Sequence, residues 1–364
     1  MDRWTTWNAV FGLLVPLLFC MAPNIRVANI DFCRRPWHYR GLAGGPEARQ
    51  ACSNLVCLTI SSMPSLPGDN DTVMDDNDDG GAAASDLFAA APNLRHLTMY
   101  DVVLQLTPRD LGLRKLQTMQ IVMSQITSGP SLCPFPAFPY PALHSIIGHS
   151  TELESFTLRD RDGRPGASEA LKAYSGLVLK ALEPSARFLK HIELSRDRFL
   201  QGPRHDKHFI ESLAAFPVLA SFTVTYDAIA PSADMFVNLV ASCPALRSFT
   251  VHDLNGVEGI SDKIGRLAET AATGSAYPAL RHVGLHPADQ ALEAWKPVFA
   301  RGNVQMHFVV SPHRDKRFPD YEAEFGALED AIEWDRRYGP MVAFESDVEV
   351  DQHDASEGEG DNED

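Results

Sequence analysis

The sequence predicts a right-handed α/β solenoid, in which short parallel strands alternate with helices. The main observation is a phrase of nine residues, clearest at residues 243–251, Cys-Pro-Ala-Leu-Arg-Ser-Phe-Thr-Val. Residues 91–99 and 277–285 repeat it, with apolar side chains at the fourth, seventh and ninth positions. The second observation is that apolar stretches with helical spacing stand between the phrases. Self-similarity of this kind is the sequence signature of a stacked array.

Looser copies of the phrase keep only its apolar triplet, at positions i, i+3 and i+5. The separation of successive triplets varies from 22 residues (Leu94 to Leu116) to 39 residues (Leu55 to Leu94), so the strands are constant and the connections vary. A degenerate tenth copy is expected at residues 304–310. The looser triplets are Ile25/Ala28/Ile30, Leu55/Leu58/Ile60, Leu116/Met119/Ile121, Leu153/Phe156/Leu158, Leu189/Ile192/Leu194 and Leu219/Phe222/Val224.

The spacing within the phrase has a physical reason. Side chains of a strand alternate between its two faces, so the i+3 and i+5 residues lie on one side of an extended segment. The proline at the front of the phrase cannot continue a helix and favours an extended residue before it. Each phrase is therefore interpreted as the end of a helix, a corner and a strand, and right-handed crossovers would join the strands into a parallel sheet.

Helices are predicted in the connections. Ser168 begins one that runs to Leu182, with Leu171, Tyr174 and Leu177 on one face. Others are expected at residues 209–216, 233–242, 260–272 and 288–299. A helix at residues 321–338 has its apolar residues on one face, and we expect it to cap the last repeat, because a solenoid must cover its terminal core.

The array resembles the leucine-rich repeat family, and more closely the irregular repeats of fungal F-box/leucine-rich-repeat proteins, over roughly residues 7–310. The phrase matches give about nine repeats. The resemblance implies a parallel sheet on the concave face and helices on the convex face. It also implies an intracellular, non-catalytic protein-binding scaffold, the substrate-recognition part of an F-box-type ubiquitin-ligase adaptor with a cullin-type ligase as partner. The sequence itself shows no recognisable F-box.

Charge is unevenly distributed along the chain. The net charge is −16, and it equals the six acids of residues 68–81 plus the ten acids of residues 345–364, which contain no Lys or Arg. Residues 63–84 and 345–364 are expected to be disordered, as an insertion and a tail of a folded region spanning residues 1–344. The remainder is close to neutral, which gives no support for binding to nucleic acid. The calcium-loop spacing of Asp75, Asn77, Asp79, Gly80 and Asp86 is interpreted as chance.

The apolar run at residues 9–22 has two interpretations. It precedes the first phrase as other helices precede theirs, which favours the helix of the first repeat. Its length also matches a signal peptide, so the alternative is a secreted or enzymatic protein that begins with a cleaved segment at residues 1–22. The run is too short to span a membrane, and Pro16 interrupts it.

No motif for catalysis, for a cofactor or for a metal is evident. The six cysteines are sparse, form no Cys-x-x-Cys pair and are interpreted as reduced structural thiols. Gly-x-Ser-x-Gly, Walker and His-Glu-x-x-His motifs do not occur. The sequence therefore predicts a protein that is not an enzyme.

The binding surface is expected on the sheet face that carries the i+2, i+4 and i+6 residues. If i+3 and i+5 point into the core, these residues project from the other face, which is rich in Ser, Thr and His. Large side chains are the first candidates for contact with a partner. They are Tyr100, Arg159, His191, His252, His282 and His286.

Overall fold

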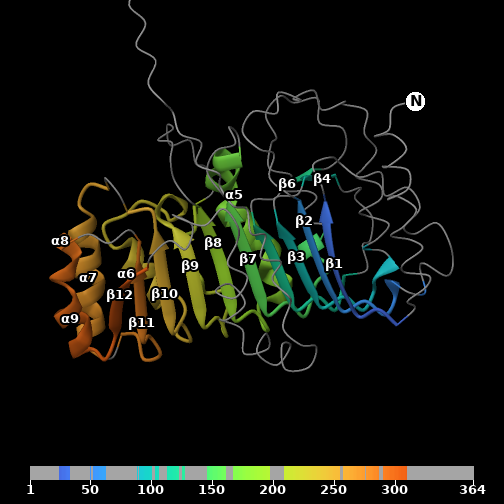
Figure 1. Cartoon of the computed structure of the whole chain (residues 1–364). Helices are drawn as coiled ribbons and strands as arrows, with labels where there is room; N and C mark the ends of the chain where they lie inside the picture. Colours follow the sequence, from blue (N-terminus) through green and yellow to red (C-terminus); the bar gives the residue numbers. More distant parts are fainter. Residues whose placement is uncertain are drawn as a thin grey trace, which may run out of the picture. The chain divides into compact units, whose positions relative to one another are not determined.

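A ten-stranded sheet, parallel throughout, dominates the computed structural model of the chain (Figure 1). The predicted α/β class with a parallel sheet is therefore confirmed. All the described residues belong to Met1–Val310, the first of the two units into which the chain divides. The structure describes residues 24–32, 50, 52–62, 88, 90–100, 103–105, 113–122, 125–127, 146–160, 167–196, 209–254, 257–274, 276–286 and 290–309.

Every predicted phrase forms one strand of this sheet, and the strands follow one another in chain order. The degenerate tenth copy is the last strand, β12. The strands are β1 (Val27–Phe32), β2 (Cys57–Ser62), β3 (His96–Tyr100), β5 (Thr118–Val122), β7 (Ser155–Asp160), β8 (His191–Arg196), β9 (Ser221–Thr225), β10 (Ser248–His252), β11 (His282–Leu285) and β12 (Gln305–Phe308).

The register of the sheet aligns equivalent positions of successive phrases. Phe222 of β9 lies beside Phe249 of β10, which lies beside Val283 of β11. Equivalent i+3 and i+5 residues from β2 to β11 are 3% exposed or less, and so are the i residues from Leu55 to Leu280. The apolar triplets are thus the core of the fold, as their spacing predicts.

The strand starts are joined by a continuous row of backbone hydrogen bonds. The carbonyl of Arg26 accepts from the N–H groups of Val56 and Cys57 at 2.7 and 3.0 Å. The carbonyl of Val56 accepts in the same way from the N–H groups of Arg95 and His96. This pattern, in which one carbonyl accepts two hydrogen bonds, recurs at each junction as far as β10–β11. We call this row the corner ladder. It satisfies backbone groups that the turn into each strand would otherwise leave buried and unpaired.

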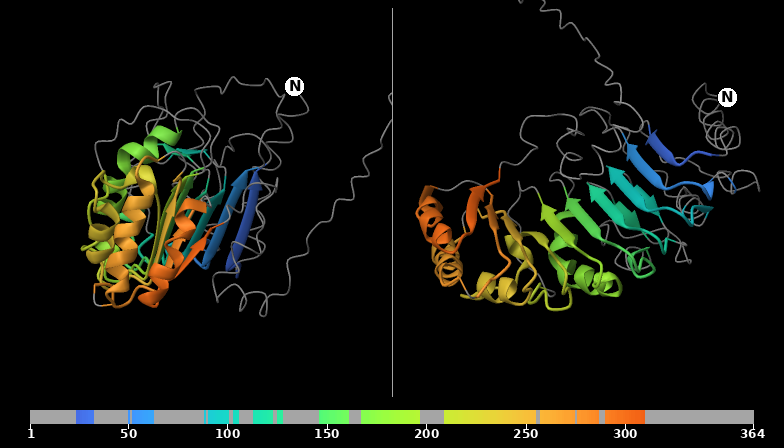
Figure 2. Two further views of the ribbon diagram at one scale, coloured as in Figure 1. Left: turned by 90° about the vertical axis from the view of Figure 1, so that its left-hand side faces the viewer. Right: turned by 90° about the horizontal axis from the view of Figure 1, so that it is seen from below.

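The helices of this unit lie together on one face of the sheet (Figure 2). We call the opposite face the open face. The 16-residue α5 (Ala167–Leu182) contacts β7 and β8, and α7 (Ile260–Ala272) contacts the helices on either side of it, α6 (Met235–Ala241) and α9 (Lys296–Arg301). The predicted helices at α5, α6 and α7 are confirmed within one or two residues. Short helical elements are α8 (Gln290–Glu293), η1 (Glu183–Ser185) and η2 (Tyr226–Ala228).

Two helix predictions are wrong. Residues 209–216 bury Ile210, Leu213 and Phe216 but form turns and a single bridge from Ile210 to Ile229. The backbone N–H of Leu213 donates to Ser242 Oγ at 2.7 Å, so tertiary contacts replace the bonds of a short, marginal helix.

The helix predicted at residues 288–299 is broken into α8 and α9. Pro297 lies in the first turn of α9, where its missing N–H costs nothing, whereas the interior of one long helix would not accept it. The break places Trp295 on α7, where its ring covers Gly265 and its Nε1–H donates to Ser261 Oγ at 3.1 Å.

A second, two-stranded parallel sheet is not predicted by the sequence. It joins β4 (Val103–Gln105) to β6 (Gln125–Thr127). The offset that pairs His96 with Thr118 also pairs Val103 with Gln125, so the small sheet keeps the β3–β5 register. These two phrases have the shortest separation in the chain.

Several predictions lie outside the described residues. They are the helix of the first repeat or signal peptide at 9–22, the acidic insertion at 63–84 with its calcium-like spacing, the capping helix at 321–338 and the acidic tail at 345–364. The first triplet is described in part, and Ile25 and Ala28 pack against the core.

We expect core truncations to destabilise the fold strongly. Leu246→Ala, Phe249→Ala or Leu280→Ala should each lower the free energy of unfolding by about 2–5 kcal/mol, because each leaves a cavity among fully buried neighbours. The Phe249→Ala variant also loses the edge contact between the rings of Phe249 and Phe236 of α6, whose centroids lie 5.9 Å apart. Urea unfolding measures the effect. Thr223→Ala, on the open face, is the control and should change stability by less than about 1 kcal/mol. Equal losses in control and core variants would contradict the assigned core.

Candidate functional site on the open sheet face

The open face carries three rows of side chains that the register aligns across the strands. The first row, at the strand starts, contains Cys57, His96, Thr118, Ser155, His191, Ser221, Ser248, His282 and Gln305. The second row contains Thr59, Thr98, Gln120, Thr157, Glu193, Thr223, Thr250, Gly284 and His307. The third row, at the strand ends, contains Ser61, Tyr100, Val122, Arg159, Ser195, Thr225, His252 and His286.

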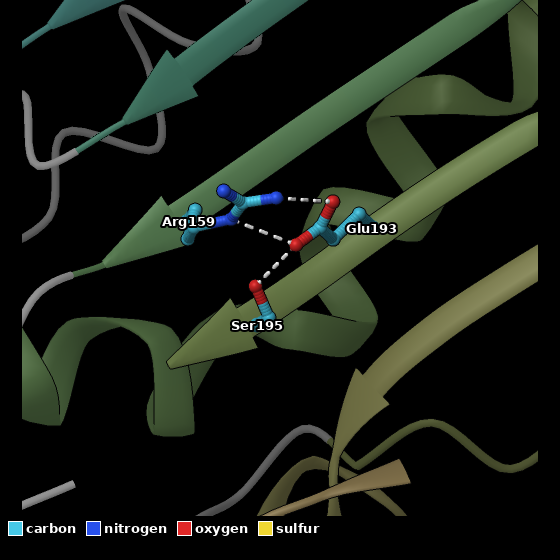
Figure 3. Close-up of polar contacts among 3 residues, drawn as sticks. All are labelled: Arg159, Glu193 and Ser195. Carbon is cyan, nitrogen blue, oxygen red and sulfur yellow. Dashed lines mark hydrogen bonds and ion pairs between the residues drawn. The ribbon is translucent and has the colours of Figure 1, made fainter. Parts of the chain in front are cut away.

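An ion pair occupies the middle of this face (Figure 3). Arg159 of β7 donates from Nε to Glu193 Oε1 at 2.9 Å and from Nη2 to Oε2 at 3.1 Å. Ser195, two residues after Glu193 on β8, donates from Oγ to the same Oε1 at 2.6 Å. The two charged side chains are only 21% and 22% exposed. A two-pronged guanidinium–carboxylate contact of this kind fixes both side chains in one geometry.

The environment of Glu193 keeps its carboxylate charged. Burial by itself would raise the pKa of Glu193, but the charge of Arg159 and the hydrogen bonds from Arg159 and Ser195 outweigh it, with a contribution from His252. The net result is a pKa below the ordinary value of 4.5. Because the folded state lowers this pKa, the ion pair stabilises the fold above pH 4.5, and the stabilisation is lost as the pH falls through the folded value.

The predicted contact residues fall at the two ends of the strands. His191 and His282 lie in the first row, whereas Arg159, His252 and His286 lie in the third. Four residues separate the rows along a strand, which is roughly 13 Å. The rings of His252 and His286 are neighbours, with 5.3 Å between centroids. The predicted set is therefore two groups rather than one cluster.

Tyr100 differs from the other predicted residues. It is 3% exposed, and its neighbours Thr98 and Val122 are also buried. Tyr100 therefore does not present a side chain for contact in this structure, although its place in the third row is the predicted one. Alternation along a strand predicts the face that a residue occupies, and tertiary neighbours decide whether that residue is accessible.

Two of the histidines have lowered pKa values. Burial lowers the pKa of His191, and the charge of Lys190 lowers it further, while Glu154 acts in the opposite direction. Burial also lowers the pKa of His307, as does the charge of His282, whose ring lies 6.3 Å from that of His307. Both imidazoles therefore remain neutral to a lower pH than an ordinary histidine.

Glu193, Ser195 and His307 are the site residues that sequence reasoning did not select. Glu193 is the only carboxylate of the second row, and it stands diagonally across from Arg159 on the next strand. Aligning the two phrases in the sequence already places these opposite charges side by side, so the ion pair could have been predicted from that alignment. His307 follows from the register of β12, which the degenerate tenth phrase does not determine.

We expect the Arg159–Glu193 pair to couple more strongly than an exposed pair. A double-mutant cycle of Arg159→Met and Glu193→Gln should give a coupling of about 1–3 kcal/mol at pH 7, because removing one partner leaves the charge of the other partly buried without the two-pronged contact. The matched control is the neighbouring pair Lys190–Glu154, at 2.7 Å but 53% and 42% exposed, which should give less than about 1 kcal/mol.

Urea unfolding at several pH values completes this test. The Arg159–Glu193 coupling should shrink below pH 4.5, as Glu193 takes up a proton. Coupling no larger than that of the control pair, or unchanged in acid, would contradict the role assigned to Glu193.

No family model matches the sequence, and no curated protein matches it. Within the described part of the chain, no group of three or more His, Cys, Asp or Glu side chains is placed to hold a metal ion, and no helix is long and apolar enough to cross a membrane.

Proposed function

We propose that this protein is a right-handed, leucine-rich-repeat-like solenoid that binds a protein partner through the open face of its sheet. The observation that carries the proposal is the continuity of the three rows, polar apart from Val122 and Gly284, across neighbouring parallel strands on the face opposite the helices. Solenoids commonly bind along the concave face that such a sheet provides.

The size of the face supports a macromolecular partner. Neighbouring strands lie ~4.8 Å apart, so the nine steps of the ten-stranded sheet extend over about 43 Å. A small ligand would use a fraction of that length, whereas a protein can contact several strands at once. In this proposal Arg159, His191, His252, His282 and His286 contact the partner, and the buried Tyr100 does not.

The ion pair at the middle of the face supports specificity. Arg159 and Glu193 are held in one orientation by their double contact and by Ser195. A fixed pair of opposite charges favours a partner with complementary polar groups and disfavours others. This role is non-catalytic.

The narrower form of the proposal rests on the resemblance stated above. In that form, the protein is the substrate-recognition part of an F-box-type ubiquitin-ligase adaptor with a cullin-type ligase as partner, and it acts inside the cell. Among the described cysteines, Cys57 and Cys243 are free thiols, which favours a reducing compartment. Burial raises the pKa of the Cys57 thiol to about 11 and also raises that of Cys243, which makes both poor nucleophiles.

Replacing His191, His252, His282 and His286 together by Ala should abolish partner binding. We expect recovery of specific partners in an affinity pull-down to fall at least ~tenfold, because several contacts on one face are lost at once. Mass spectrometry of the recovered proteins identifies the partners and shows whether a cullin is among them.

The control is a variant of the helix side, Asp262→Ala with Arg266→Ala and Glu269→Ala, since all three residues are exposed on α7. It should retain every partner. A folded histidine variant that also retains every partner at equal affinity would mean that the helices or the loops carry recognition instead.

A further inference from the structure

A pocket lies at the strand-start edge of β1, β2, β3 and β5, away from the second and third rows of the open face. Its lining is basic and amidic apart from one apolar side chain. The lining residues are Arg26, Asn54, Val56, Asn93, Arg95 and Lys115. Each stands immediately before or three positions before its strand, so the corner ladder fixes their order along the edge.

The ladder creates the pocket by alternating long and short side chains. Arg26, Val56 and Arg95 occupy equivalent corner positions, and each backbone is bonded to the next. The two guanidinium-bearing residues are therefore two strand steps apart, about 9.6 Å between backbones. The shorter Val56 lies between them and leaves room for a small group within reach of both arginines.

Hydrogen bonds orient a third cation towards the same space. Lys115 Nζ donates to Asn93 Oδ1 at 2.7 Å, and Asn93 Nδ2 donates to the carbonyl of Ser53 at 2.8 Å. The amide of Asn93 is thus fixed, and it holds the ammonium group of Lys115 at the pocket.

No described carboxylate lies within ion-pair distance of Arg26, Arg95 or Lys115. The nearest acid along the corner row is Glu154, and it already pairs with Lys190 at 2.7 Å. The neutral Gln117 occupies the corner position between Arg95 and Glu154. Three cations thus share a pocket without a described counter-ion, in a chain whose net charge is −16.

We propose that this pocket binds a phosphate dianion, either free or as the terminal group of a phosphate monoester. A phosphate dianion presents three terminal oxygens and about two charges, which match two guanidinium forks and one ammonium group. A carboxylate has two oxygens and one charge, so it satisfies the pocket less completely. Val56 gives an apolar surface for the carbon that carries the ester. The proposal is independent of partner binding on the open face.

Two sources supply this group, free phosphate and a phosphorylated side chain, and one titration separates them. The full-length chain is titrated with a fluorescent phosphoserine peptide, with the same peptide carrying serine, and with inorganic phosphate as competitor. We expect the phosphopeptide to bind at least ~tenfold more tightly than the serine peptide, since charge-assisted hydrogen bonds are lost with the phosphate. Direct binding of inorganic phosphate with no preference for the phosphopeptide would identify free phosphate as the ligand of the same pocket.

Variants locate the site. Arg26→Ala with Arg95→Ala should weaken binding at least ~tenfold, and Arg95→Lys, which keeps the charge but loses the fork, should weaken it ~threefold. The matched control is Arg247→Ala with Arg281→Ala, at the equivalent corners of β10 and β11. It removes the same charge outside the pocket and should change affinity less than ~twofold. Equal loss in the control, or no binding of either phosphate probe, would overturn the proposal.

Discussion

The corner ladder is the interaction on which the rest of this structure depends. At each strand start, one carbonyl accepts from two successive amides of the next strand, at distances between 2.7 and 3.1 Å from β1–β2 through β10–β11. Because each residue before a strand is bonded in the same way, no strand can slip by one position relative to its neighbour without breaking these bonds. A slip of one residue would also exchange the buried and open faces, so backbone bonding and apolar burial enforce the same register.

This register links the core to the candidate site. One alignment buries the i+3 and i+5 side chains against the helices and displays the three polar rows on the other face. It brings Arg159 of β7 beside Glu193 of β8, and His252 beside His286. It also places Arg26, Val56 and Arg95 in one line at the strand starts, where two long basic side chains flank a short apolar one. The pocket and the ion pair are therefore both products of strand alignment, although they lie at different places on the sheet.

Much of the fold could be predicted because the apolar triplet repeats a local pattern: Leu246, Phe249 and Val251 each occupy the buried position that their spacing indicates. The helix failures came from elements whose stability is tertiary. Residues 209–216 bond to Ala228, Ala230 and Ser242 instead of forming a helix, and Pro297 divides the final helical segment. The face of each candidate residue was likewise predictable from strand alternation, but the burial of Tyr100 and the diagonal contact of Arg159 with Glu193 depend on neighbours from other strands. A single sequence does not give the distances between side chains on different strands.

Native-state hydrogen exchange is the most direct test of the claim that one continuous ladder aligns the sheet. The informative amides are those that donate at the corners, such as Arg95 and His96, Lys190 and His191, and Arg247 and Ser248. We expect these amides to be protected to a similar extent as the strand interiors beside them, because both exchange only when the stacked strands open together. Fast exchange at the corners, with protection confined to the strand interiors, would contradict a continuous ladder and would leave the register to apolar packing alone.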